Sequence, residues 1–130
     1  MSRALCPTLS PQVRSRAKQA ELPQLTMSSA TVVRVWRTEI DTDRAGEYDE
    51  FVRTKSMPMF QRQAGFVAAL FCGQASSRVV ITLWQGRAAV DALRTSETYR
   101  ETVSEIEAAG FLQGSQTTDI FDLDAHSVRE

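Results

Sequence analysis

Two stretches of the chain, residues 31–40 and 78–84, have the composition of β-strands and carry apolar side chains at both odd and even positions. In the first, Val33 and Val35 lie on one parity while Trp36 lies on the other, and the second stretch has the same two-sided pattern. Successive side chains of a strand point to opposite faces of the sheet. An antiparallel sheet with one face in water would alternate apolar and polar residues. We therefore expect both faces of the sheet to be covered.

A helix is expected after the first strand. The segment Asp41-Thr42-Asp43 offers N-cap residues. Apolar side chains, with one lysine, then recur at helical spacing: Tyr48, Phe51, Val52, Lys55 and Met59. Pro58 lacks a backbone N–H, so we expect a break or kink near Met57, followed by a further turn. Gly65 is the natural C-terminal cap.

The next two strands are expected to form an antiparallel hairpin. Residues 66–72 are apolar, too few for a helix and rich in aromatic side chains. The turn residues 73–77 would connect them to the strand 78–84.

A second helix and a last strand complete the domain. Residues 86–106 carry apolar patches at helical spacing, and Thr95 or Ser96 could cap a second helical piece within them. Gly110 would end the helix. Residues 117–123 predict the last strand.

The resulting order is strand, helix, strand, strand, helix, strand. This is the split βαβ pattern of ferredoxin-like folds. The predicted fold class is therefore α+β, with a four-stranded antiparallel sheet and two helices on one of its faces. No remaining segment could cover the second face, because the N-terminal segment is polar and interrupted by prolines. We expect a second copy of the chain to cover that face, giving a homodimer with two-fold symmetry.

One domain, residues 31–124, is expected between two polar segments. Residues 1–30 hold three of the four prolines and four basic residues against Glu21 alone, a balance of +3. We predict that they form a poorly ordered extension, and that residues 125–130 form a polar tail. Met27, just before the first strand, could be the natural start site, which the intact mass of the native protein would test.

Charge and composition exclude several classes of function. The net charge is −1, which gives no electrostatic argument for binding nucleic acid or an anionic membrane. No apolar stretch approaches the roughly 20 residues that span a bilayer. The N-terminus lacks the apolar core of a secretory signal, and its Arg-rich start resembles a transit peptide only weakly.

Cysteine and histidine usage points to a cytoplasmic protein without a metal site. Cys6 and Cys72 do not suggest a disulfide framework, and Cys72 is expected to be a small buried hydrophobe. The single histidine, His126, lies in the polar tail and is expected on the surface. One histidine and two distant cysteines cannot form a structural zinc site.

These residues resemble the antibiotic biosynthesis monooxygenase (ABM) domain, one of the dimeric α+β barrel families. The resemblance covers roughly 90 residues. It rests on the first strand, the acidic turn and helix with Phe51, the segment Gln63-Ala64-Gly65-Phe66, the strand 79–84 that ends in Trp84, and the second helix with Ala88-Ala89, Leu93, Ser96 and Tyr99. It implies the ferredoxin-like fold and the homodimer.

The resemblance also implies an activity. Members of this family oxygenate polycyclic phenols or quinols with O₂ and without a metal or flavin. From this resemblance we expect a cofactor-independent monooxygenase-like protein that acts on a small aromatic or quinone-type molecule. The haem-cleaving branch uses an Asn on the first strand, then a Trp and a His in the second helix. Those helix positions fall near Ala92 and Thr102 here, and the chain contains no asparagine, so we exclude haem degradation of that type.

Five residues are candidates for a substrate pocket: Arg34, Trp36, Phe60, Trp84 and Tyr99. Trp84 could stack on an aromatic substrate, or it could be a packing residue whose indole N–H is bonded locally. Trp36 could line the cavity or lie in a core or subunit interface, and Tyr99 could bond a substrate hydroxyl or belong to the core. An arginine on a covered face must be paired or near a ligand. Arg34 is thus a candidate partner for an anion or phenolate, with an ion pair between subunits as the alternative.

Two other functions remain open. The first is a non-enzymatic dimeric module that binds a small ligand or serves a stress-related role. The lack of asparagine and of a core histidine favours it. The second is an isomerase or lactone-forming protein of the same fold, which a carboxylate or tyrosine with a shifted pKa inside the pocket would support.

Overall fold

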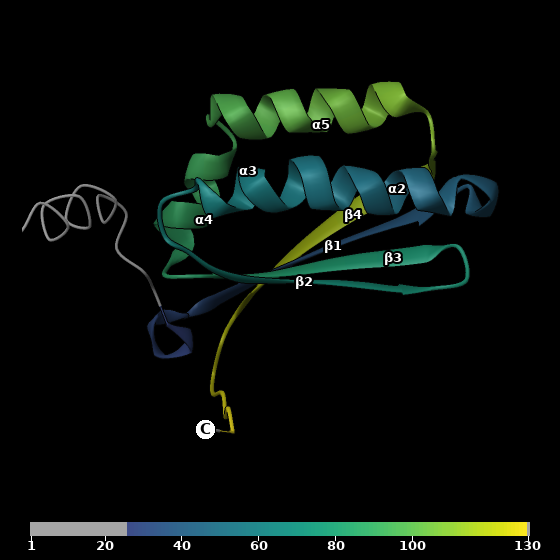
Figure 1. The fold of residues 1–130 in the computed structure, drawn as a ribbon. Helices are drawn as coiled ribbons and strands as arrows, with labels where there is room; N and C mark the ends of the chain where they lie inside the picture. Colours follow the sequence, from purple (N-terminus) through teal and green to yellow (C-terminus); the bar gives the residue numbers. More distant parts are fainter. Residues whose placement is uncertain (1–25, 130) are drawn as a thin grey trace, which may run out of the picture.

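The computed structural model describes residues 26–129, so most of the expected N-terminal extension lies outside the described residues. The elements follow the predicted order (Figure 1). They are η1 (Met27–Ser29), β1 (Val32–Ile40), η2 (Thr42–Arg44), α2 (Ala45–Phe51), the π-helical turn η3 (Val52–Ser56), α3 (Met57–Gln61), β2 (Phe66–Gln74), β3 (Ser77–Trp84), α4 (Arg87–Leu93), α5 (Glu97–Ala109) and β4 (Leu112–Asp122).

The four strands form one open antiparallel sheet in the order β2-β3-β1-β4. Helices α2, α3, α4 and α5 all lie on one side of it (Figure 1). The predicted ferredoxin-like α+β fold is confirmed. Within the described part of the chain, no helix is long and apolar enough to cross a membrane.

The first helical region passes Pro58 without the expected break. Segments α2, η3 and α3 follow one another directly, and Met57 N–H donates to the Val52 carbonyl, five residues back. Pro58 lies in the first turn of α3. A proline there removes no intrahelical hydrogen bond from its own segment. The irregularity in this helical region is therefore the π turn η3, which ends two residues before Pro58.

The second helical region divides where it was predicted to divide. Ser96 caps α5, because its Oγ accepts a hydrogen bond from Tyr99 N–H at 3.3 Å. Gly110 follows Ala109 in the left-handed conformation, with φ of 84°, and ends the helix. The cap therefore fixes the position of Tyr99 in the first turn of α5.

Two strands are longer than predicted. β2 continues to Gln74, because the two residues Ala75 and Ser76 are enough to turn the chain, with Ala75 at a φ of 55°. β4 begins at Leu112 rather than near residue 117, and its first residues pair with the end of β1 beyond a bulge between Arg37 and Glu39. The early part of β4 is polar and exposed, so it carries no alternating pattern from which a strand could be predicted.

The two faces of the sheet differ in what covers them. Even-numbered residues of β1 and β3 face the helices and join two core clusters, one around Trp84 and one around Ile40 and Phe111. Odd-numbered residues of β1 and β3, and their partners on β2 and β4, form the open face: Val33, Val35, Ala68, Leu70, Cys72, Val79, Ile81, Leu83 and Phe121. Cys72 is exposed there, which corrects the expectation that it is buried.

Candidate functional site

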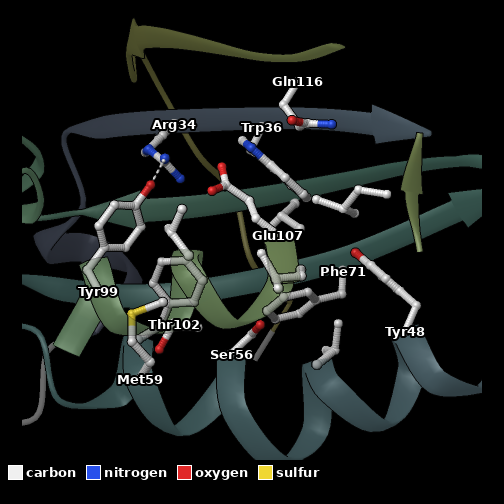
Figure 2. A pocket seen from close by; sticks show the side chains of 16 residues that line it. Arg34, Trp36, Tyr48, Ser56, Met59, Phe71, Tyr99, Thr102, Glu107 and Gln116 are labelled. Carbon is white, nitrogen blue, oxygen red and sulfur yellow. Dashed lines mark hydrogen bonds between the residues drawn. The ribbon is translucent and has the colours of Figure 1, made fainter. Parts of the chain in front are cut away.

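A cavity of about 120 Å³ lies between the helix-covered face of the sheet and the helices (Figure 2). Most of its walls are apolar or aromatic. The remaining lining residues carry polar or charged side chains: Arg34, Ser56, Tyr99, Thr102, Glu107 and Gln116. A mainly apolar cavity with a few placed polar groups is the usual form of a small-molecule site.

Strand parity and helix spacing bring the cavity residues together. Arg34 and Trp36 share the even parity of β1, so both point toward the helices. Tyr99, Thr102 and Ile106 recur at helical spacing along α5 and form the facing wall. The cap at the start of α5 sets this helix so that Tyr99 faces Arg34 (Figure 2).

Arg34 and Tyr99 form the most polar part of the cavity. The side chain of Arg34 is nearly buried, with an exposed fraction of 7%. Its Nη2 donates to the Tyr99 hydroxyl at 2.8 Å, and its guanidinium carbon lies 5.6 Å from the centre of the Tyr99 ring. Within residues 26–129 Arg34 has no carboxylate partner. A buried cation without a counter-ion favours an anionic or electron-rich ligand.

The other polar side chains that line the cavity differ in whether they have a hydrogen-bond partner within the protein. Thr102 Oγ1 donates to the Thr98 carbonyl at 2.9 Å, and Gln116 Nε2 donates to Thr38 Oγ1 at 3.1 Å. Glu107 is exposed, but it lines the cavity, and Figure 2 shows its carboxylate directed toward Arg34 and Trp36 without forming an ion pair with Arg34. Ser56 is buried and has no side-chain hydrogen bond within the described residues.

Tyr48 lines the far end of the cavity and is the lining residue with a clearly shifted pKa. Burial raises the pKa of Tyr48 to about 12. Its hydroxyl therefore stays protonated at neutral pH and can donate a hydrogen bond, but it cannot act as a general base. A tyrosine with a shifted pKa in the pocket is the condition set for the isomerase or lactone-forming alternative, and the raised pKa suits Tyr48 to donate a proton rather than accept one.

Four of the five predicted pocket residues line the cavity: Arg34, Trp36, Phe60 and Tyr99. Trp84 does not. It is fully buried, stacks edge-on against Phe60 and Phe66, and donates its indole N–H to Thr82 Oγ1 at 2.8 Å. The position of Trp84 fits the packing alternative.

Sequence reasoning missed Ser56, Glu107 and Gln116. A signal for Ser56 exists, because it lies between Val52 and Phe60 on the apolar side of the first helical region. Glu107 and Gln116 follow no pattern that separates them from solvated surface residues. His126 is exposed in the C-terminal segment, away from the cavity lining.

Metal-ligating residues do not gather in the described part of the chain. Residues 26–129 contain no group of three or more His, Cys, Asp or Glu side chains that could hold a metal ion. The chemistry available at the cavity is that of a guanidinium, hydroxyls, one carboxylate, one amide and aromatic walls.

Comparison with known proteins gives matches at the level of structure. No family model and no curated protein sequence matches the chain. Among solved structures, the monooxygenase from the gene ActVA-Orf6 of Streptomyces coelicolor, in complex with Nanaomycin D, superposes with a TM-score of 0.68 and 12% identity. The match covers 79% of this chain and 96% of that one.

Two further structures have the same fold. A mutant of SnoaB, a cofactor-independent oxygenase from Streptomyces nogalater, gives a TM-score of 0.59 at 20% identity, covering 75% of this chain and 96% of that one. The NE2512 protein of unknown function from Nitrosomonas europaea gives 0.65 at 14% identity, covering 78% and 97%. The chain therefore has the fold of the antibiotic biosynthesis monooxygenase-type proteins.

Proposed function

We propose that the protein is a cofactor-independent monooxygenase-like protein that acts on a small aromatic or quinone-type molecule. The observation that carries this proposal is Arg34, a buried cation whose side-chain hydrogen bond goes to Tyr99 in an aromatic-lined cavity. The fold, shared with proteins that are themselves monooxygenases, supports it.

The size of the cavity narrows the substrate. An engineered apolar cavity of about 150 Å³ holds benzene. The present cavity, at about 120 Å³, has room for one ring rather than for several fused rings. We therefore propose a single-ring quinol or phenol.

In the proposed reaction the protein binds the ring and stabilises its anion. The positive charge of Arg34 lowers the pKa of a bound phenol, and the phenolate makes the ring electron-rich. For a hydroquinone, the ring donates electrons to O₂. One oxygen atom forms a bond to a ring carbon, the O–O bond breaks, and the other oxygen leaves as water with two substrate hydrogens. The product is a hydroxyquinone.

Oxygen consumption with single-ring quinols tests the proposal. Wild-type protein should consume O₂ above the rate of autoxidation and incorporate one labelled oxygen atom into the product. Arg34→Met should lower that rate at least tenfold while folding normally, since it removes a buried unpaired charge. Arg37→Met is the matched control, because Arg37 lies on the same strand but is exposed and paired with Asp119. Autoxidation rates alone, or hydrogen peroxide as the product, would contradict the proposal.

A binding module without chemistry is the second candidate. It is favoured by a specific observation: none of the described lining residues is a histidine, and Tyr48 cannot act as a base at neutral pH. Tight binding of single-ring phenols without oxygen uptake would support this function over the first.

We also infer that a second copy of the chain covers the open face of the sheet. Leu70 and Phe121 are each 52% exposed on that face, among the apolar side chains of β1 and β3. A contiguous apolar face of this kind marks an interaction surface, and two such sheets can pack about 10 Å apart. Sedimentation at micromolar concentration should give twice the chain mass of 14.5 kDa. A monomer at that concentration would contradict the inference.

A cytoplasmic location is proposed on the basis of cysteine usage. Among the described residues Cys72 is a free cysteine, and free thiols persist in reducing compartments. Fractionation of native cells tests this, and recovery of the protein outside the cytoplasm would contradict it.

A further inference from the structure

The π turn decides which side chain of the first helical region faces the cavity. Helical spacing predicts Lys55 on the buried side, but in the structure Lys55 is exposed and pairs with Glu105 at 3.4 Å. The extra residue of the π turn shifts the register, so that Ser56 takes the inward position. Turns of this kind occur frequently at functional sites.

Ser56 is the exception among the buried arginine, serine and threonine side chains of the described residues, and the buried hydroxyl of Tyr48 likewise has no hydrogen-bond partner within residues 26–129. The buried arginine and threonine side chains are bonded: Arg34 donates to Tyr99, Thr38 accepts from Gln116, and Thr82 accepts from Trp84. Ser56 has an exposed fraction of 8% and lines the cavity, yet its hydroxyl has no partner within residues 26–129. A buried hydroxyl without a partner costs free energy. A ligand oxygen in the cavity would satisfy it.

Ser56 and Arg34 lie on opposite walls of the cavity. Arg34 projects from β1 in the sheet and Ser56 from the helical layer (Figure 2). The cavity between them holds about one ring. In the arrangement that we infer, a bound ring lies between these walls, with one side toward Arg34 and Tyr99 and the other toward Ser56.

We infer that Ser56 is a specificity-determining residue, and that the ligand carries oxygen at two opposite ends of a single ring. This inference rests on the proposed function of the cavity and names its substrate class: para-oxygenated rings such as hydroquinones, in preference to monophenols. Arg34 and Tyr99 bind one oxygen, and the Ser56 hydroxyl bonds the other.

Two probes of similar size separate these classes. Hydroquinone has a second hydroxyl where 4-methylphenol has a methyl group. Binding of each is measured by calorimetry without oxygen, so that no turnover occurs. Wild-type protein should prefer hydroquinone. Ser56→Ala should weaken hydroquinone binding about three- to tenfold, the effect of one hydrogen bond, and leave 4-methylphenol binding unchanged or tighter.

Two further variants separate the hydroxyl from its packing. Ser104→Ala makes the same substitution at an exposed position of α5 and should change neither affinity. Ser56→Thr keeps a hydroxyl and should keep the preference for hydroquinone. If Ser56→Ala weakens the binding of both probes equally, or weakens neither, the inference is overturned.

The same measurements distinguish this inference from the proposed function. A preference that depends on Ser56, without oxygen uptake in the earlier assay, would support the inference and contradict the monooxygenase reaction. Wild-type protein that binds neither probe would overturn both.

Discussion

The two faces of the sheet are equally apolar in sequence but differ in their polar residues. The helix-covered face buries Arg34, Thr38 and Thr82, and the cavity lies against it. The open face has no buried polar side chain among the described residues, and its charged pair, Arg37 and Asp119, is exposed. Apolar content therefore indicates only that a face is covered. The buried polar groups indicate which face binds a small molecule.

This comparison separates two roles. On the covered face, most buried polar side chains have a partner within the chain. The hydroxyls of Ser56 and Tyr48 have none among the described residues, and Arg34 bonds to Tyr99 but has no carboxylate partner, so these three groups are available to a ligand. On the open face, the large apolar side chains can be covered by an apolar surface without a polar partner. The first arrangement favours chemistry or binding, and the second favours assembly.

The largest expected loss of stability comes from truncating Trp84, which lies on the covered face. We expect Trp84→Ala to lower the free energy of unfolding by about 3–5 kcal/mol, because it leaves a cavity in the core and removes the hydrogen bond from the indole N–H to Thr82 Oγ1. Urea denaturation measures this. Trp84→Phe keeps much of the volume and should lose less. A loss below about 1 kcal/mol would mean that the covered face does not carry the stability of the domain.

The second test places a charge on the open face. Leu70→Lys should weaken the dimer by about 2–3 kcal/mol, because the ammonium group loses water in the interface. The unfolding free energy of the separated chains should change by less than about 0.5 kcal/mol, since Leu70 is half exposed on an edge strand. Sedimentation over a range of protein concentrations measures the free energy of dimer formation.

Met57→Lys is the matched control for that test. Met57 is also a partly exposed apolar residue, but it lies on α3, away from the open face. Equal effects of the two lysines on association would show that the dimer does not form through the sheet.

The fold could be predicted from the sequence because the periodicity of apolar residues and the capping residues at helix ends are both local features of the chain. The two-sided strands, the Ser96 cap and Gly110 each have a local cause that needs no tertiary information. The first half of β4 could not be predicted, since its polar residues become a strand only by pairing with the end of β1.

The candidate site was only partly predictable for a related reason. Arg34 and Trp36 could be placed together from the sequence, because residues two apart in one strand lie on the same face of the sheet. Ser56 was missed although it lies four residues from both Val52 and Phe60, because the expected helix placed Lys55 on the apolar side and the π turn moves Ser56 there instead. Trp84 was ambiguous because the same aromatic residue suits a core or a pocket.

The third test uses pH to probe the covered face. Burial raises the pKa of Tyr48 to about 12, whereas an unfolded tyrosine titrates near 10. Between these values the unfolded state has lost its proton and the folded state has not, so stability is full below about pH 10 and falls as pH rises toward 12. The loss should be on the order of 2 kcal/mol.

Tyr48→Phe isolates this effect from other groups that titrate at high pH. The variant should lose less stability than the wild type between about pH 10 and 12 in urea denaturation. Parallel curves would show that the Tyr48 hydroxyl reaches solvent in the folded protein, and that this end of the cavity is open.

The smallest expected effect is at Glu39, at the margin of the open face. The hydroxyls of Ser76 and Ser77 donate to its two carboxylate oxygens and hold the pKa of Glu39 below its usual range. Replacing both serines with alanine should return that pKa to its usual range, as followed by carbon NMR of the carboxyl group. Because the folded pKa is lowered, the bonds contribute stability above the usual pKa, and this contribution is lost as pH falls through the folded value.

The exposure of Glu39 keeps the effect on unfolding small, so the NMR titration is the informative measurement. Ser104→Ala should leave the titration unchanged. An unchanged Glu39 pKa in the double variant would mean that the serines do not hold the carboxylate in solution. If the pKa does rise, the serines satisfy the carboxylate of Glu39 at the hairpin end of β1. A second copy of the chain could then cover the apolar residues of the open face while Glu39 stays hydrogen-bonded at its margin and Arg37 stays paired with Asp119.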